Sequence, residues 1–261
     1  MSIILIGHGK WGANYVRTAP DAGCVVDVCM SRPPDLDQLA KTHQGVIIAT
    51  HPPDSTRLAI EALEAGLHVM IEKPATLDVR SAKWLVEAER KSGKIVLVNH
   101  QHLFAPGYEE LRARLLADDA HASTHIVHSQ AGGPGPVRAY SALWDYGPHD
   151  VSMALDIIGP AKLETIRWYD LEGCGDIVFV GERGWADLTV SNKFVEKQRW
   201  FAVDHLNYYD YKHPLTRSLR AFAAAVAAGG TDDRRFGARW ALDVARVLAA
   251  AESFASTPPI V

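Results

Sequence analysis

The chain has 261 residues, of which 48% are hydrophobic and 22% are charged, and its formal net charge is −4. These values are typical of a globular protein, and the weakly acidic balance gives no reason to expect nucleic acid or an anionic membrane as a partner. The three cysteines have no metal-ligand spacing, and no apolar run approaches the length of a membrane span. We therefore expect a cytoplasmic protein whose first strand follows directly on the N-terminus, without a leader peptide.

The first hundred residues predict an alternation of strands and helices. Short apolar runs without polar alternation indicate strands buried on both faces, at Ile3–Ile6, Val25–Met30, Val46–Thr50, His68–Ile71 and Ile95–Val98. Helices are predicted between them at Ala13–Ala19, Ser55–Ala65 and Asp78–Lys91, with Asp78 as an N-cap and Gly66 and Gly93 at helix ends. This order predicts a doubly wound parallel sheet, and we assign residues 1–105 to this domain.

Residues 106–261 are predicted to form a smaller α+β domain. Five runs alternate apolar and polar residues, which is typical of antiparallel strands with one covered face. They are Thr124–Ser129, Leu163–Tyr169, Asp176–Val180, Ala186–Ser191 and Arg199–Asp204. Helices are predicted at Tyr108–Leu116, Pro148–Ile158, Leu215–Ala228 and Ala238–Ser256.

The first predicted strand leads into a Gly-x-Gly-x-x-Gly motif, and a predicted helix follows it. In this order Gly7 permits the tight turn, Gly9 lets the backbone approach a pyrophosphate, and Gly12 lets the helix pack close to the strand. The motif therefore predicts a dinucleotide site, and the alternative is an ordinary glycine-rich turn. The loop expected to bind the cofactor comprises Gly7, His8, Gly9, Lys10, Trp11 and Gly12.

The ends of the second and third strands supply further expected cofactor contacts. Ser31 and Arg32 stand where an acidic residue would bind a ribose hydroxyl, and they offer a donor and a cation to a 2′-phosphate. NADP is therefore favoured over NAD, the alternative being a solvated turn. Thr50, His51 and Pro52 follow the third strand and are expected to line the nicotinamide side.

The fourth predicted strand ends in Glu72-Lys73-Pro74. A lysine at a strand end beside the cofactor can hydrogen-bond a substrate oxygen and favour a developing alkoxide. Glu72 and Lys73 are therefore predicted to lie at the cofactor site. The alternative is a surface ion pair of little consequence.

A second group of candidate residues surrounds Pro148, which suits the first turn of a helix. His149 is predicted on the polar side of that helix with Ser152 and Asp156, where the positive helix end favours a neutral imidazole that can accept a proton. Asp150 opposes this effect, so the net shift in the pKa of His149 stays open. Asp145 precedes it by four residues and could orient the ring or the substrate. The alternative is a capping aspartate and a solvent-facing histidine.

The twelve histidines raise the question of a metal site. His100 and His102 could share a strand face, and His125 and His128 lie further along the chain. No motif adds a carboxylate or thiolate at ligand spacing, so no catalytic metal is expected.

Together these motifs resemble the Gfo/Idh/MocA family of oxidoreductases (glucose-fructose oxidoreductase and inositol dehydrogenase). The resemblance rests on Gly7-x-Gly9-Lys10-Trp11-Gly12-x-Asn14, Val46–Thr50, Ala62–Val69 leading into Glu72-Lys73-Pro74, Asp145-x-Gly147-x-His149, and Leu219–Phe222 with the last helix. It implies a Rossmann domain followed by a domain with a mainly antiparallel open sheet, and an active site between them. It also implies that Lys73 positions the reacting oxygen, His149 transfers the proton and Asp145 assists.

By this resemblance we expect an NAD(P)-dependent oxidoreductase that interconverts a secondary alcohol and a ketone on a sugar, a cyclitol or a nucleotide-linked sugar. A non-catalytic dinucleotide sensor and an imine or enone reductase are the alternatives. The family commonly oligomerises through its second-domain sheet, so a homo-oligomer is one expectation. Because this chain is shorter than most members in that sheet, its oligomeric state stays open. Leu103-Phe104 also replaces an arginine–phenylalanine pair that many members carry.

Overall fold

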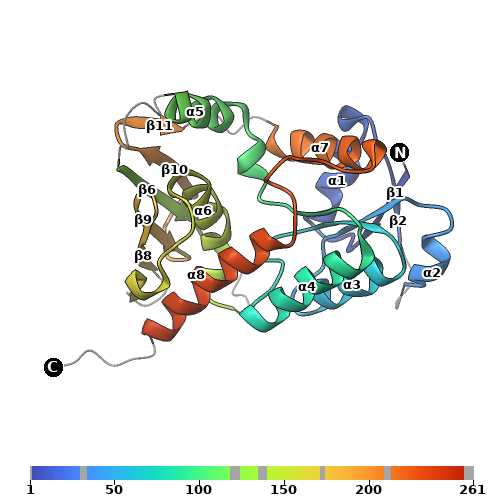
Figure 1. The fold of residues 1–261 in the computed structure, drawn as a ribbon, viewed down its shortest axis with the longest axis horizontal. Coiled ribbons are helices and arrows are strands. Elements are labelled where there is room, and N and C mark those ends of the chain that lie inside the picture. The colour runs from blue at the N-terminus through green and yellow to red at the C-terminus, as the bar shows by residue number, and fades with distance from the viewer. Residues whose placement is uncertain are drawn as a thin grey trace. The chain divides into compact units, whose positions relative to one another are not determined.

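The computed structural model describes residues 2–29, 34–117, 124–134, 140–170, 174–208 and 213–255 (Figure 1). The chain forms two compact units that are each discontinuous in sequence. The first contains Met1–Phe104 and His213–Leu242, and the second contains Ala105–Lys212 and Asp243–Val261. The predicted division into two consecutive domains, with a boundary near residue 105, stays a prediction.

The first unit contains a five-stranded sheet of order β2-β1-β3-β4-β5. Its strands are β1 (Ser2–Ile6), β2 (Val25–Val28), β3 (Gly45–Ile48), β4 (His68–Ile71) and β5 (Val96–Val98). Every pair in the sheet is parallel, which confirms the predicted doubly wound sheet. The central strands β3 and β4 are buried on both faces, apart from the half-buried His68, because apolar side chains point to both sides of the sheet.

Helices and short 3₁₀ turns connect the strands of the first unit: α1 (Gly12–Thr18), η1 (Pro20–Ala22), α2 (Leu36–Leu39), α3 (Asp54–Glu64) and α4 (Val79–Ser92). The unit also contains η2 (Gln101–Phe104), which follows β5, and α7 (Pro214–Ala228), which comes from the later part of the chain. The predicted cap is confirmed, because Asp78 Oδ1 accepts a hydrogen bond from the Ser81 amide at 2.8 Å. Gly93 ends α4 in the left-handed conformation, at φ +63°. The last helix, α8 (Arg239–Ala255), has residues in both units.

The second unit contains a six-stranded sheet of order β11-β10-β6-β9-β8-β7. Its strands are β6 (His125–Gly132), β7 (Arg167–Asp170), β8 (Cys174–Gly181), β9 (Gly184–Ser191), β10 (Gln198–Val203) and β11 (Leu206–Tyr208). All pairs are antiparallel except β6 with β9, so the sheet is mainly antiparallel as predicted. Residues 163–165, predicted as strand, form the 3₁₀ turn η3 (Leu163–Thr165) instead.

The helices of the second unit include α5 (Pro106–Ala117) and α6 (Ala142–Ile158). Burial alternates along β8 and β9, which confirms one covered face. Helix α6 packs on that face: a methyl group placed on Gly147 would lie 3.5 Å from Ile177 and 3.0 Å from Leu248. Among the helices within the described ranges, none is both long and apolar enough to cross a membrane.

Candidate dinucleotide and catalytic site

The glycine loop joins β1 to α1, and two of its glycines are required by the fold itself. Gly7 has φ +101°, and a Cβ there would lie 2.6 Å from the backbone of Ala49. A Cβ on Gly12 would lie 2.1 Å from the carbonyl oxygen of Gly7. Only glycine fits such a left-handed turn and such a close helix approach.

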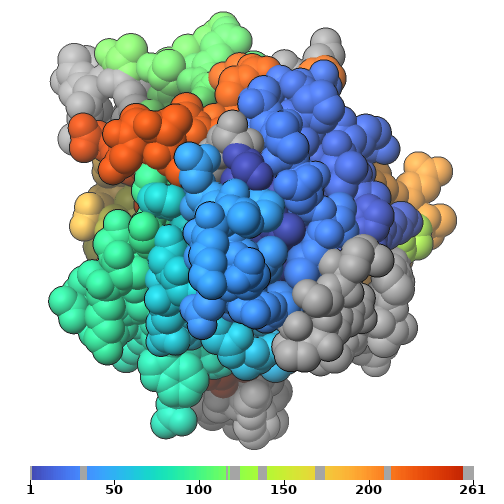
Figure 2. All heavy atoms as spheres, turned by 90° about the vertical axis from the view of Figure 1, so that its right-hand side faces the viewer, coloured from blue at the N-terminus to red at the C-terminus, as the bar shows by residue number. Residues whose placement is uncertain are grey.

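Gly9 differs from these two glycines, because a Cβ there would meet no heavy atom of the described residues within 4 Å. His8, Lys10 and Trp11 beside it are also exposed, and Trp11 is 42% exposed. The loop therefore leaves open space above its backbone, as a pyrophosphate requires. Figure 2 shows a face formed largely by first-unit residues, with the darkest blue atoms belonging to the N-terminal segment.

Further expected cofactor residues follow β3. Thr50 lies two residues beyond the strand and is half-buried, while His51 is exposed. The Thr50 Oγ1 atom is buried and has no hydrogen-bond partner among the described residues. A ligand that supplied a donor or acceptor there would remove the cost of that orphaned atom, so the strand end fits a polar cofactor group. Ser31 and Arg32, on which the NADP preference depends, lie outside the described residues.

Glu72 and Lys73 follow β4, and the Glu72 side chain points into the protein. Glu72 is 7% exposed and accepts hydrogen bonds from the Tyr15 hydroxyl and, at 2.7 Å, from Asn99 Nδ2. Its second carboxylate oxygen accepts the Lys73 backbone N–H at 3.2 Å. Glu72 is therefore an internal acceptor rather than half of a surface ion pair, and Lys73 is half-buried.

The positive charge of Lys73 affects the pKa of a buried histidine, His100. His100 follows β5 and is 2% exposed. Burial first, and the Lys73 ammonium second, lower the pKa of His100 to about 3. His100 is therefore a neutral imidazole at physiological pH.

Helix α6 places Asp145 and His149 differently from the sequence prediction. The helix begins at Ala142 after Ser141, so Pro148 lies inside the helix instead of in its first turn. The predicted effect of the helix N-terminus on His149 is wrong for this reason, because that effect fades beyond the first turn. Asp145 lies in the first turn, and its separation of four residues from His149 puts both on one face.

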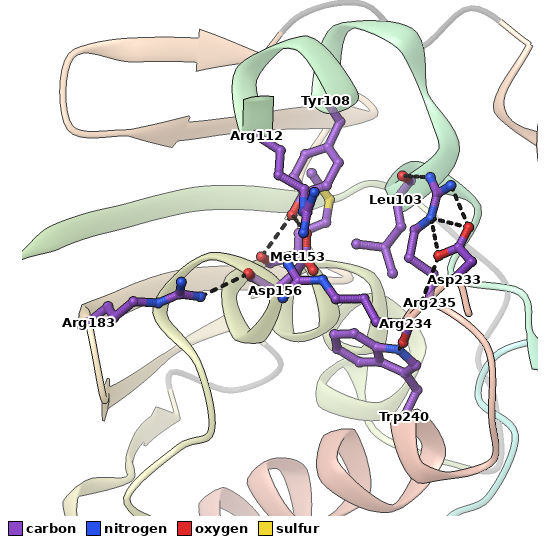
Figure 3. Close-up of polar contacts among 10 residues, drawn as sticks. All are labelled: Leu103, Tyr108, Arg112, Met153, Asp156, Arg183, Asp233, Arg234, Arg235 and Trp240. Carbon is purple, nitrogen blue, oxygen red and sulfur yellow. Dashed lines mark hydrogen bonds and ion pairs between the residues drawn. The ribbon is translucent and has the colours of Figure 1, made fainter. Parts of the chain in front are cut away.

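The predicted polar face of α6 is also wrong, because the helix is buried on all sides from Gly147 to Ile158. His149 is 6% exposed. Two buried carboxylates are compensated by arginines: Asp150 contacts Arg199 at 2.6 Å, and Asp156 contacts Arg112 at 2.9 Å. Tyr108 also donates to Asp156 at 2.9 Å (Figure 3). These pairings make full burial of a polar helix face possible.

Several residues that organise the site were not predicted from the sequence. Tyr15 and Asn99 had no role assigned, although Asn99 directly follows a predicted strand. Arg235 is another, because it donates to the Leu103 carbonyl at 2.9 Å (Figure 3). Its guanidinium also lies 4.1 Å from the centre of the Phe104 ring. Arg235 thus places a guanidinium beside Leu103-Phe104, the pair for which the family resemblance implied an arginine.

Lys73 belongs to the first unit, and Asp145 and His149 belong to the second. The convergence of these three residues on one reaction therefore stays a prediction. Within the described ranges, no group of three or more histidine, cysteine, aspartate or glutamate residues could hold a metal ion.

The parallel sheet, the glycine loop and the polar strand ends define an NAD-binding protein of the Rossmann class. The sequence model of the oxidoreductase family with NAD-binding Rossmann fold, GFO_IDH_MocA, matches residues 19–100. This match and the relatives described below support a Gfo/Idh/MocA oxidoreductase.

Three relatives illustrate the similarity. D-glucoside 3-dehydrogenase of Escherichia coli K12 is 25% identical over 73% of this chain and 64% of its own length. The Salmonella typhimurium LT2 protein YceM is 30% identical over 82% of this chain and 65% of its own length. A crystal structure of a Magnetospirillum magnetotacticum MS-1 protein shares the fold, with a TM-score of 0.79, 27% identity and coverage of 96% of this chain and 99% of that one. The chain thus spans just under two thirds of the length of these two curated relatives.

Proposed function

We propose that this protein is an NAD(P)-dependent dehydrogenase that interconverts a secondary alcohol and a ketone on a sugar, a cyclitol or a nucleotide-linked sugar. The observation that carries the proposal is the position of Lys73. Lys73 follows the carboxyl end of β4, and dinucleotides bind at this end of the strands in parallel sheets. Strand β4 lies two strands away from β1, which leads into the glycine loop. The Lys73 backbone N–H is held by the buried carboxylate of Glu72. The relative that acts on D-glucosides supports a sugar-like substrate.

In the proposed reaction the chain's residues handle the oxygen and its proton. The Lys73 ammonium binds the substrate oxygen and stabilises the negative charge that develops on it. His149 accepts the hydroxyl proton during oxidation and returns it during reduction. Asp145, on the same face of α6, orients the imidazole or the substrate. When bound, NAD(P) supplies the acceptor for the hydride that leaves the carbon.

The glycine loop and the strand ends would hold the cofactor. A Cβ on Gly9 would meet no described heavy atom within 4 Å, which leaves room for the pyrophosphate, and Thr50 Oγ1 offers an unused polar atom on the nicotinamide side. Ser31 and Arg32 support NADP as the preferred form, because arginine can pair with a 2′-phosphate. His51, Pro52 and Glu72 remain proposed neighbours of the cofactor.

The outer face of the second-unit sheet is the proposed contact for a homo-oligomer. The imidazole of His128 packs against Trp185 with ring centres 5.2 Å apart, and Trp200 is 37% exposed. Light scattering of the purified protein, with Trp200→Asp as the variant, tests this assembly. A variant that keeps the wild-type mass would argue against this face.

A substrate panel tests the proposed function. Methyl β-D-glucoside, myo-inositol and UDP-N-acetylglucosamine represent the three substrate classes, each with NAD⁺ and with NADP⁺, and absorbance at about 340 nm follows reduced cofactor. We expect turnover of at least one compound. Tight cofactor binding with no turnover of any hydroxyl compound would favour the non-catalytic sensor, and turnover of imines or enones alone would favour the reductase.

A further inference from the structure

Three buried polar side chains from separate elements meet beneath the carboxyl edge of the parallel sheet. Tyr15 lies on α1, Glu72 follows β4 and Asn99 follows β5. Tyr15 and Asn99 are fully buried, and Glu72 is 7% exposed. Asn99 Nδ2 lies 2.7 Å from both the Tyr15 hydroxyl oxygen and Glu72 Oε1, and the Tyr15 hydroxyl contacts the same Glu72 oxygen.

The chemistry of the three groups fixes which atom donates each hydrogen bond. An ionised carboxylate can only accept, so Asn99 must present its NH₂ group and Tyr15 its O–H to Glu72. The Tyr15 oxygen then accepts from Asn99. Burial first, and the Glu72 charge second, raise the pKa of Tyr15 well above its ordinary value, so the phenol remains a donor throughout the working pH range.

The second oxygen of Glu72 connects this network to Lys73. Glu72 Oε2 accepts the Lys73 backbone N–H at 3.2 Å. The backbone of Glu72 is held in turn by its N–H bond to the Ile48 carbonyl at 2.9 Å, and that of Asn99 by its bond to Ile71 at 2.8 Å. Tyr15 follows the last glycine of the loop by only three residues. The network therefore joins the helix of the dinucleotide loop to the peptide of Lys73.

We propose that Tyr15 and Asn99 act through Glu72 as positioning residues for Lys73. Glu72 holds the Lys73 peptide with one oxygen, while Tyr15 and Asn99 prevent the carboxylate from rotating by binding the other. This assigns an internal role to the side chain of Glu72. The inference rests on the proposed function, because it matters to turnover only if Lys73 takes part in the reaction.

Nuclear magnetic resonance tests the structural half of this proposal without any substrate. In protein labelled with ¹⁵N-lysine, the Lys73 amide is assigned by its disappearance in Lys73→Met. A bond to a carboxylate is charge-assisted, so this proton should resonate downfield and exchange slowly in the wild type. Tyr15→Phe and Asn99→Leu should each move it upfield and speed its exchange. An unchanged Lys73 amide in both variants would overturn the proposal.

A double-mutant cycle tests the functional half. Turnover is measured with whichever of myo-inositol, methyl β-D-glucoside and UDP-N-acetylglucosamine the protein oxidises. Tyr15→Phe should lower kcat by about 10-fold in the wild-type background, the scale expected for a misplaced reacting group, and should cost almost nothing further in Lys73→Met. A merely structural role would cost the same factor in both backgrounds.

Tyr108→Phe is the matched control, because it removes another buried tyrosine hydroxyl that donates to a buried carboxylate, at 2.9 Å from Asp156. Any loss it causes should be equal in both backgrounds. Full turnover of Lys73→Met would refute the proposed function, and the amide signal would still decide the positioning claim. A slow Lys73→Met with equal Tyr15→Phe losses in both backgrounds would refute the positioning claim alone.

Discussion

Asp150 and Arg199 form an ion pair at 2.6 Å, in which the carboxylate is fully buried and the guanidinium is largely covered. The pair ties α6 to β10 immediately beside His149. It explains how the charged side chain of Asp150 can lie buried within the second unit. The positive charge of Arg199 also offsets the negative charge of Asp150, so the neighbouring His149 does not face an uncompensated carboxylate.

Removing one partner of this pair should be costly. Arg199→Leu should lower the free energy of unfolding by about 3 kcal/mol, because a buried carboxylate loses a charged partner. Arg114→Ala is the control: it breaks a pair with Glu110 in which both side chains are 63% exposed, and it should cost less than about 0.5 kcal/mol. Urea denaturation measures both. An equal loss of unfolding free energy in the two variants would contradict the claim that burial makes the Asp150–Arg199 pair important for stability.

Two glycines of the loop should have different roles, Gly12 in folding and Gly9 in cofactor binding. Gly12→Ala should destabilise the protein, because its Cβ would lie 2.1 Å from the Gly7 carbonyl oxygen. Gly9→Val should leave the melting temperature nearly unchanged, since a Cβ at that position meets open space among the described residues, but should weaken NADPH and NADH binding together. Thermal melts and cofactor titrations are the measurements. Wild-type affinity in folded Gly9→Val would contradict the assignment of this loop.

Cofactor choice should depend on Arg32. Arg32→Ala should weaken NADPH binding and leave NADH binding nearly unchanged, because only NADPH carries the 2′-phosphate. Fluorescence titration of both cofactors gives the affinity ratio. An unchanged ratio would show that NADP preference, if present, comes from other residues.

His100 should contribute to acid sensitivity. Its pKa is lowered to about 3 in the folded protein, so between that value and the ordinary value of 6.5 the unfolded chain binds the additional proton. Its contribution to stability is thus present above pH 6.5 and is lost as pH falls from there toward 3. His100→Gln should show a shallower fall in unfolding free energy over this range. His205→Gln, at an exposed position, is the control, and identical slopes for His100→Gln and wild type would contradict the prediction.

The sequence predicted features that depend on local pattern. All five parallel strands were expected from their apolar runs, although β2 and β3 end two residues earlier than predicted. The requirement for glycine at Gly7 and Gly12 followed from motif spacing. These features could be predicted because strand burial and tight turns restrict the types of residue within a short stretch of sequence.

Features that depend on tertiary partners were not accessible in the same way. Pro148 was interpreted as a helix start because proline is favoured there, and nothing local showed that residues 142–147 would add turns before it. The burial of α6 depends on Arg112 and Arg199, which lie far away in sequence. The bonds among Tyr15, Glu72 and Asn99 span 27 to 84 residues, so no sequence window contains them.

The most direct test of the central claim is the turnover of Lys73→Ala, His149→Ala and the double variant at saturating substrate and cofactor. Each single variant should lower kcat by roughly 100-fold or more, with cofactor affinity nearly unchanged. The double variant should lose little beyond the larger single loss, since residues that act in one step are not additive. Lys162→Ala and His205→Ala, both at exposed positions, are the controls and should turn over normally. Full turnover in Lys73→Ala or His149→Ala would contradict the account.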